Sequence, residues 1–216
     1  MSILICVAHP DDETLGCGGT LFGSGALVAT FTDGVGARCG PEADAVARAE
    51  SLLKACDVLG LEVVEAHASF PDNELDIVPM LDLARRVEQL IGSDVTTIYT
   101  HHPGDLNVDH RRVAEAVLVA TRPGGRYPVR EVYAMEIPSS TEWTFGQIAP
   151  AFLPNVFVNI TQSLEKKLEA FACYDDELRE SPHPRALSSL VHHAASWGAV
   201  AGCAYAEAFQ LIRSLR

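Results

Sequence analysis

Short apolar runs alternate along this chain with longer stretches in which apolar residues recur at helical spacing. The apolar runs cover residues 3–8, 26–31, 62–66, 96–100, 130–135 and 155–160. Strand-length runs that alternate with helix-length stretches are typical of parallel sheets whose strands are joined by crossover helices. The pattern therefore predicts an α/β protein with a mostly parallel sheet.

The clearest helix is predicted over residues 41–59. Pro41 suits a helix start and Gly60 suits the position just after a helix end. Arg48 and Lys54 lie on the face that is predicted to be polar. Further helices are predicted over residues 79–91, 108–120, 164–174 and 186–201. The last two make the C-terminal portion more helical than the rest of the chain.

The composition favours one compact domain over residues 1–216. A chain of 216 residues with 48% hydrophobic content can bury a substantial core, and no repeat or linker divides it. Its apolar stretches are strand-length or interrupted, and no basic leader precedes the first one, so no membrane insertion is expected. The six cysteines form no Cys-x-x-Cys pair, which argues against a thiolate zinc site and favours a reducing cytoplasm.

The charge balance excludes some partners. The chain carries 16 Lys plus Arg against 29 Asp plus Glu, which gives a formal net charge of −13. Such a chain has no overall electrostatic attraction to phosphate backbones or to anionic membranes. Nucleic acid is therefore not an expected partner.

Two clusters of polar residues directly follow two of the predicted strands. His9, Asp11 and Asp12 come after the run 3–8, and a second cluster over residues 101–110 comes after the run 96–100. Parallel strands end at the same edge of a sheet, where open α/β folds bind their ligands. We therefore expect the two clusters to form one site.

These residue types predict a metal site. His9 and Asp12 at positions i and i+3 of a βα loop can both turn inward, and His110 can supply a third ligand. Two imidazoles and one carboxylate suit a catalytic Zn²⁺, which keeps a fourth position open for water. The metal acidifies that water, and Asp11 beside it is a candidate general base. The simpler alternative is that Asp11 and Asp12 only form a turn that caps a helix.

Asp109 has two compatible interpretations. It can orient a metal-binding imidazole through a hydrogen bond, as metal-bound histidines generally require. It can also be an ordinary acidic residue at a helix N-terminus, where the helix dipole favours negative charge.

Residues 8–16 read Ala-His-Pro-Asp-Asp-Glu-Thr-Leu-Gly, and together with the distal pair Asp109-His110 they resemble the LmbE/PIG-L family of zinc-dependent N-deacetylases. The resemblance extends to residues 70–76, 104–107 and 182–185, which are similar to a bacterial branch associated with sugar and polysaccharide pathways.

The resemblance implies a Rossmann-like fold with three α/β/α layers. It also implies that His9, Asp12 and His110 bind zinc and that Asp11 is the general base. The expected partner is a small N-acetylated amino-sugar substrate, and a homo-oligomer fits the family.

One position departs from the family pattern. Well-studied members carry a histidine three positions before the distal metal ligand, and this chain has Asn107 there. An asparagine can donate a hydrogen bond to an oxyanion but cannot deliver a proton at neutral pH. The general acid is then either Asp11, after it has taken the proton of the water, or another histidine. His183 is the preferred candidate because Pro182 and Pro184 hold it stiffly, although a surface turn explains it equally well.

Three further residues are candidates for substrate binding. Arg48 and Arg38 could hold a hydroxyl, carboxylate or phosphate group, and Trp143 could stack on a sugar ring. For Arg48 and Arg38 a solvated surface position is the simpler explanation, and for Trp143 a core or interface position.

The sequence thus predicts a zinc-dependent hydrolase that removes an N-acetyl group from an amino sugar, a sugar nucleotide or a related sugar conjugate. An amidase for N-acyl or thiol conjugates and a zinc-binding protein without catalysis are alternatives within the same family. A nucleotide-binding module that holds Mg²⁺ is a third alternative, but Mg²⁺ prefers oxygen ligands to the imidazole of His9.

Overall fold

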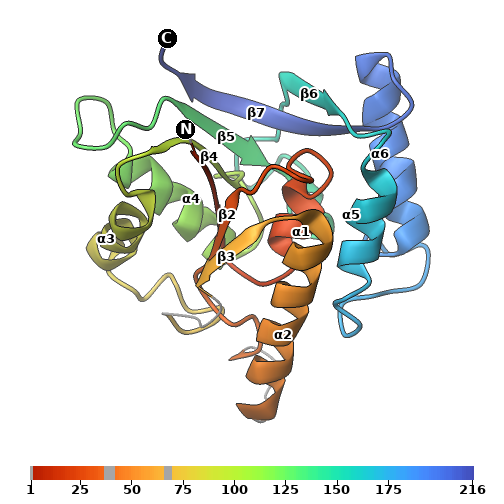
Figure 1. Cartoon of the computed structure of the whole chain (residues 1–216), viewed down its shortest axis with the longest axis horizontal. Coiled ribbons are helices and arrows are strands. Elements are labelled where there is room, and N and C mark those ends of the chain that lie inside the picture. Colours follow the sequence, from red (N-terminus) through yellow and green to blue (C-terminus); the bar gives the residue numbers. More distant parts are fainter. Residues whose placement is uncertain (1, 37–41, 66–69) are drawn as a thin grey trace.

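The computed structural model describes residues 2–36, 42–65 and 70–216. A seven-stranded sheet in the order β3-β2-β1-β4-β5-β7-β6 runs through the molecule (Figure 1). The strands are β1 (Ser2–Val7), β2 (Leu27–Thr30), β3 (Glu62–Glu65), β4 (Val95–His101), β5 (Glu131–Met135), β6 (Val156–Asn159) and β7 (Ala206–Ser214).

Helices cover both faces of the sheet. They are α1 (Asp12–Cys17), α2 (Glu42–Leu59), α3 (Met80–Ile91), α4 (Val108–Ala120), α5 (Leu164–Phe171) and α6 (Leu187–Ala201), with the short 3-10 helix η2 (Glu142–Thr144). Helices α3 and α4 lie on one face, and α1, α2, α5 and α6 lie on the other (Figure 1). The predicted three-layer α/β/α architecture is therefore confirmed.

Strands β1 to β5 are parallel, as the alternating pattern predicts. The C-terminal part differs from the prediction, because β7 enters between β5 and β6 and pairs antiparallel with both. The apolar run at 155–160 is thus an antiparallel edge strand. No strand is predicted over 206–214, where apolar and polar residues alternate only loosely, whereas the two helices predicted for the C-terminal portion are present as α5 and α6.

The central strand β1 is buried on both faces, and its side chains alternate between two cores. Ile5 and Val7 pack under α1, α2 and α5, whereas Leu4 and Cys6 pack under α3 and α4. A strand covered by helices on both sides needs a continuous apolar sequence rather than an alternating one. The run 3–8 satisfies this requirement, which is why it was recognisable as a strand.

The strand order reverses direction between β1 and β4. The chain leaves β1 towards β2 on one side, and it leaves β4 towards β5 on the other. The helices that follow the two strands, α1 and α4, lie on opposite faces of the sheet. Open α/β sheets bind ligands in the crevice that forms at such a switch point, outside the carboxyl ends of the strands.

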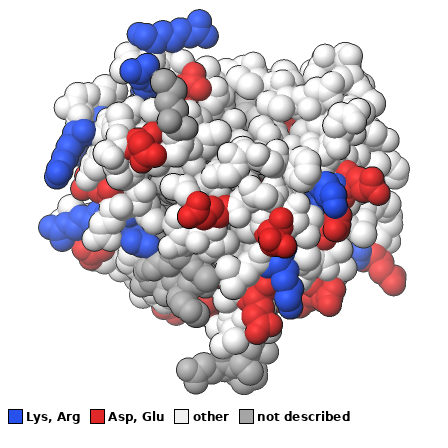
Figure 2. Space-filling model, viewed as in Figure 1, with Lys and Arg blue, Asp and Glu red and all other residues white. Residues whose placement is uncertain are grey.

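Two further features concern the distribution of charged side chains on the surface and the length of the helices. Acidic and basic side chains lie interspersed on the face that Figure 2 shows. Within the described ranges, no helix is both long and apolar enough to cross a membrane.

A buried ion pair fastens α5 to β7 and to the turn after α1. The ammonium group of Lys167 lies 2.5 Å from the Glu207 carboxylate and donates to the carbonyl oxygen of Leu15 at 2.8 Å. Glu207 also accepts the backbone N–H groups of Gly19 and Thr20, at 3.0 and 2.7 Å. Both side chains are almost completely buried.

We expect Lys167→Ala to lower the free energy of unfolding by about 3 kcal/mol, because it leaves the buried Glu207 charge without its cation. The measurement is equilibrium unfolding in urea. Lys166→Ala is the matched control, since Lys166 on the same helix pairs with Glu169 from an exposed position. The prediction is wrong if the two variants unfold at the same urea concentration.

Candidate metal centre

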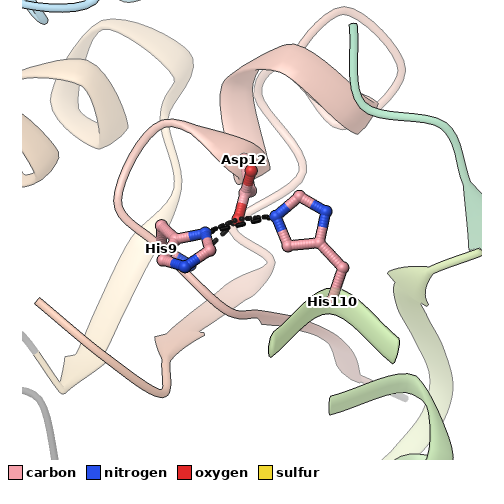
Figure 3. A group of neighbouring side chains, drawn as sticks. All are labelled: His9, Asp12 and His110. Atoms are coloured by element: carbon pink, nitrogen blue, oxygen red, sulfur yellow. Dashed lines mark hydrogen bonds and ion pairs between the residues drawn. The ribbon is translucent and has the colours of Figure 1, made fainter. Parts of the chain in front are cut away.

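The carboxylate of Asp12 lies at the centre of the candidate site. Its Oδ2 atom is 3.2 Å from Nδ1 of His9 and 3.4 Å from Nε2 of His110 (Figure 3). The two imidazole nitrogens lie 3.2 Å from each other. His9 follows β1, Asp12 begins α1 and His110 lies in the first turn of α4, so the switch point brings the two polar clusters together.

The three donor atoms fit a divalent metal ion. A tetrahedral zinc with bonds of about 2.0 Å separates its ligand atoms by about 3.3 Å, which matches the three distances in this site. Asp12 is completely buried, and its second oxygen, Oδ1, has no hydrogen-bond partner among the described residues. A buried carboxylate oxygen without a partner is costly in the free protein, and a bound cation would relieve that cost.

Asp105 holds the ring of His110 in place. Its Oδ1 atom is 3.1 Å from Nδ1 of His110, on the side of the ring opposite Asp12. The hydroxyl groups of Ser140 and Thr141 donate to the two oxygens of Asp105. Although burial acts to raise the pKa of Asp105, the neighbouring His110 holds that pKa well below its usual range. This carboxylate was not among the site residues selected from the sequence, although it lies in the 101–110 cluster and in the segment 104–107 that shares in the family resemblance.

Asp109 contacts the other histidine of the site. Its Oδ2 atom is 3.4 Å from Nε2 of His9, and its two oxygens accept the backbone N–H groups of Asn73 and Leu75, at 2.6 and 3.0 Å. Asp72 lies on the same side of His9, with Oδ1 3.2 Å from Nε2. The structure therefore places Asp109 where it orients His9 and anchors the loop after β3.

His101 connects the two loops through its ring. The backbone N–H of Ala8 donates to Nε2 of His101 at 2.8 Å, so this nitrogen carries no proton. Burial and the neighbouring His110, on which the ring stacks at 3.9 Å between ring centroids, together lower the pKa of His101 to about 3. The hydrogen bond from Ala8 to the neutral imidazole of His101 thus joins the end of β4 to the residue that follows β1.

The backbone at Asp11 is strained, with φ 111° and ψ −30°. Non-glycine residues in such regions cost of order 1–3 kcal/mol, and the surrounding structure must hold them there. Glu13 does so, because its carboxylate accepts the N–H of Asp11 at 3.0 Å and the hydroxyl of Tyr174 at 2.7 Å. Burial raises the pKa of Glu13 to about 7.

Two arginines flank the side chain of Asp11. Oδ2 of Asp11 lies 3.0 Å from Arg48 and 3.1 Å from Arg185. Glu177, which is buried, also contacts both guanidinium groups, Arg48 at 3.1 Å and Arg185 at 2.5 Å. We call these four residues the charge ring. Burial raises the pKa of Asp11 to about 6, against the opposing charges of Arg185 and Arg48.

The position of Arg48 corrects the prediction of a solvated helix face. Only 4% of its surface is exposed, since its guanidinium also donates to the carbonyl oxygen of Pro10 at 2.6 Å and to Asp176 at 3.0 Å. The helical pattern placed Arg48 on the polar side of α2 with Lys54, but Lys54 is exposed, whereas Arg48 lies one turn before the buried Leu52 on the inner side of the helix.

A cleft of about 180 Å³ opens beside the metal-binding side chains. Its lining comes from the loops after β1 to β4, from helix α2 and from the segment between α5 and α6. The lining residues are His9, Asp11, Gly34, Arg48, Asp72, Asn73, Asn107, Glu177 and Arg185. This polar lining suits a hydrophilic ligand.

The remaining predicted site residues lie in different places. Asn107 lines the cleft, but its side-chain oxygen caps α4 by accepting the N–H groups of Asp109 and His110. His183 and Trp143 are not among the lining residues and pack against each other edge to face, 5.9 Å between ring centroids. Arg38 lies outside the described residues.

The fold and the site together define a class of protein. It is an α/β protein with a candidate metal centre of two histidines and one aspartate at the switch point of its sheet. The chain belongs to the GlcNAc-PI de-N-acetylase (PIG-L) family, whose model matches residues 4–121. The resemblance of residues 8–16 and of the pair Asp109-His110 to this family is therefore confirmed, and the protein is a hydrolytic enzyme of the deacetylase type.

Individual relatives agree with this assignment. The chain is 27% identical to the uncharacterized deacetylase YaiS of Escherichia coli over 177 residues, which cover 74% of this chain and 82% of YaiS. It is 25% identical to a probable N-acetyl-alpha-D-glucosaminyl L-malate deacetylase 2 of Bacillus cereus over 190 residues, 80% of this chain and 81% of that protein. The structure of N,N'-diacetylchitobiose deacetylase from Pyrococcus horikoshii has a similar fold, with a TM-score of 0.75 at 18% identity, covering 98% of this chain and 84% of that one.

We expect Asp105→Asn to weaken zinc binding roughly tenfold to hundredfold, the usual effect of removing a carboxylate that orients a metal-binding histidine. The substitution keeps the shape of the side chain but removes the charge that faces His110. Competition with a zinc chelator measures the affinity.

Glu115→Ala is the control, because Glu115 is an exposed acid on α4, the helix that carries His110. Circular dichroism establishes that both variants are folded. Unchanged zinc affinity in folded Asp105→Asn would show that Asp105 does not position the ligand.

Proposed function

We propose that this protein is a zinc-dependent hydrolase that removes an N-acetyl group from an amino sugar, a sugar nucleotide or a related sugar conjugate and releases acetate. The observation that carries the proposal is the match between the three donor distances, 3.2 to 3.4 Å, and the edge of a tetrahedral zinc site. Two imidazoles favour zinc over Mg²⁺, which prefers oxygen ligands. The names of the relatives, with their N-acetylated sugar substrates, support the choice of substrate class.

A zinc ion held by His9, Asp12 and His110 would act as a Lewis acid that polarises the acetyl carbonyl and lowers the pKa of the attacking water. Asp11 lines the same cleft as His9 and is the carboxylate that accepts the proton of that water. With its pKa raised to about 6 by burial, Asp11 is a stronger base than an ordinary aspartate and still ionised at neutral pH.

The same residue supplies the proton to the leaving amine. Asn107 cannot deliver a proton, and the structure does not place His183 in the cleft lining. Asp11 carries the proton that it has taken from the water and can pass it on to the amine nitrogen. Asn107 then serves as a neutral donor, because its oxygen is committed to the cap of α4 and only its NH2 group is left for the substrate.

Arg48 takes a different role from the predicted one. Its guanidinium group already contacts oxygens of Pro10, Asp11, Asp176 and Glu177. We therefore assign it to positioning Asp11 rather than to binding substrate. A homo-oligomeric state and a cytoplasmic location stay predictions.

The substrate class is tested by a panel of N-acetylated sugars, sugar nucleotides and N-acyl thiol conjugates, with released acetate as the readout. Acetate from the sugars or sugar nucleotides supports the proposal, and turnover of thiol conjugates alone supports the amidase. A zinc-loaded protein that hydrolyses none of them would be a binding protein rather than an enzyme.

Asp11→Asn is expected to lower kcat by about 10²- to 10⁴-fold, the range for loss of a general base. Zinc content should remain stoichiometric, because Asp11 is not one of the three ligands. Acetate release and elemental analysis measure the two quantities on the same sample.

Asp175→Asn is the control for this variant, since Asp175 is an exposed acid in the segment that also carries Glu177. It should keep the activity of the unchanged protein. Substantial turnover by zinc-loaded Asp11→Asn would rule out Asp11 as the base.

His110→Ala is expected to lose the metal, because two protein ligands remain where a catalytic zinc uses three. The measurement is the zinc content after dialysis against a weak chelator. His192→Ala, which removes an exposed histidine on α6, should keep its zinc. Stoichiometric zinc in His110→Ala would mean that the third ligand is another residue.

A further inference from the structure

Arg185 is the part of the charge ring that has no assigned role. It belongs to the segment between α5 and α6, and it reaches the cleft from a part of the chain far from the two polar clusters. Its Nη1 atom contacts Asp11 at 3.1 Å and Glu177 at 2.5 Å. Its Nε atom donates to the hydroxyl of Ser139 at 2.8 Å.

The two arginines of the charge ring differ in which of their guanidinium nitrogens contact protein oxygens. Both terminal nitrogens of Arg48 contact protein oxygens, and 3% of its side chain is exposed. For Arg185 the exposed share is 17%, and within the part of the chain that the structure describes its Nη2 atom makes no hydrogen bond. Arg185 therefore has a donor group left for a ligand in the cleft.

The surroundings hold this donor in a fixed position. Glu177, which is buried, and Asp11 bind one edge of the guanidinium group. Ser139, whose own backbone adopts a left-handed φ of 70°, binds the Nε side. A donor that is fixed before the reaction stabilises developing charge without a cost of reorganisation.

Charge distinguishes Arg185 from the other donors of the cleft. Asn107 offers a neutral amide, and both terminal nitrogens of Arg48 are bound to protein oxygens, while its Nε atom is buried without a partner among the described residues. A guanidinium group stays charged at all relevant pH values and donates in a planar fork that matches oxygen anions. It sits next to the oxygen of Asp11, and hence next to the place where the attacking water must lie.

We propose that Arg185 is a catalytic residue that donates from Nη2 to the acyl oxygen of the substrate as negative charge develops there during attack of the water. This inference rests on the proposed hydrolysis at the same site. The carbonyl double bond opens as the carbon–oxygen bond to the water forms, and the electron pair moves to the acyl oxygen beside Arg185. The proton of the water goes to Asp11.

The first test separates catalysis from substrate binding. Arg185→Gln and Arg185→Ala are expected to lower kcat by about 10²-fold, the effect of removing one oxyanion donor, and to change KM much less. Arg185→Lys keeps the charge but loses the fork and should fall between them and the unchanged enzyme. A loss that appears only in KM, or no loss, would overturn the proposal.

The second test separates catalysis from a structural role of the charge ring. Added guanidinium ion should restore part of kcat in Arg185→Ala, because it can refill the vacated position, and the zinc content should match that of the unchanged protein. Arg179→Ala, which removes a more exposed arginine of the same segment, should show neither the loss nor the rescue. A kcat that guanidinium does not restore, in a variant that keeps its zinc, would assign Arg185 to structure alone.

Failure of this inference is distinguishable from failure of the proposed function. The unchanged protein is assayed first, and turnover with stoichiometric zinc establishes the hydrolysis independently of Arg185. An unchanged protein that releases no acetate would overturn both. An active one whose Arg185 variants keep their kcat would overturn only the role of Arg185.

Discussion

The burial of the Asp12 carboxylate is the constraint on which the site depends. Its Oδ2 atom lies within 3.5 Å of ring nitrogens from His9 and His110, and it accepts the backbone N–H of His9 at 2.9 Å. A carboxylate that is removed from water must be compensated by donors or cations. The chain supplies them by bringing the start of α4, which carries His110, against the loop after β1, and this contact lies at the switch point.

A second group of buried charges, the charge ring, lies next to the Asp12 carboxylate. The charge ring contains two carboxylates and two guanidinium groups, so it is neutral as a whole, and each carboxylate bridges both arginines. Within this ring Asp11 keeps a pKa that burial raises to about 6, while Arg48 and Arg185 prevent a larger rise. The ring therefore places a base of moderate strength beside the candidate metal ligands.

The parts of the fold that were predicted correctly are those with a local signal. The apolar run of β1 is continuous because helices cover both of its faces, and α2 stops at Gly60 because the chain leaves the helix with positive φ there. The strand β7 was missed because its pattern is weak and its partners, β5 and β6, lie at least 47 residues earlier in the chain. Antiparallel pairing of this kind depends on contacts that no local pattern reports.

The sequence by itself determined the α/β class and the family, and it selected His9, Asp12 and His110 as the side chains that the structure brings together. The α/β class follows from the alternation of apolar runs with helical stretches, and the family follows from the resemblance of residues 8–16 and the pair Asp109-His110 to a known motif. Only the tertiary structure decided that Asp105 orients His110, that Asp109 faces His9 and that Arg48 and Arg185 flank Asp11. Those contacts join residues from separate elements, and the burial that makes their charges matter exists only after the sheet has assembled.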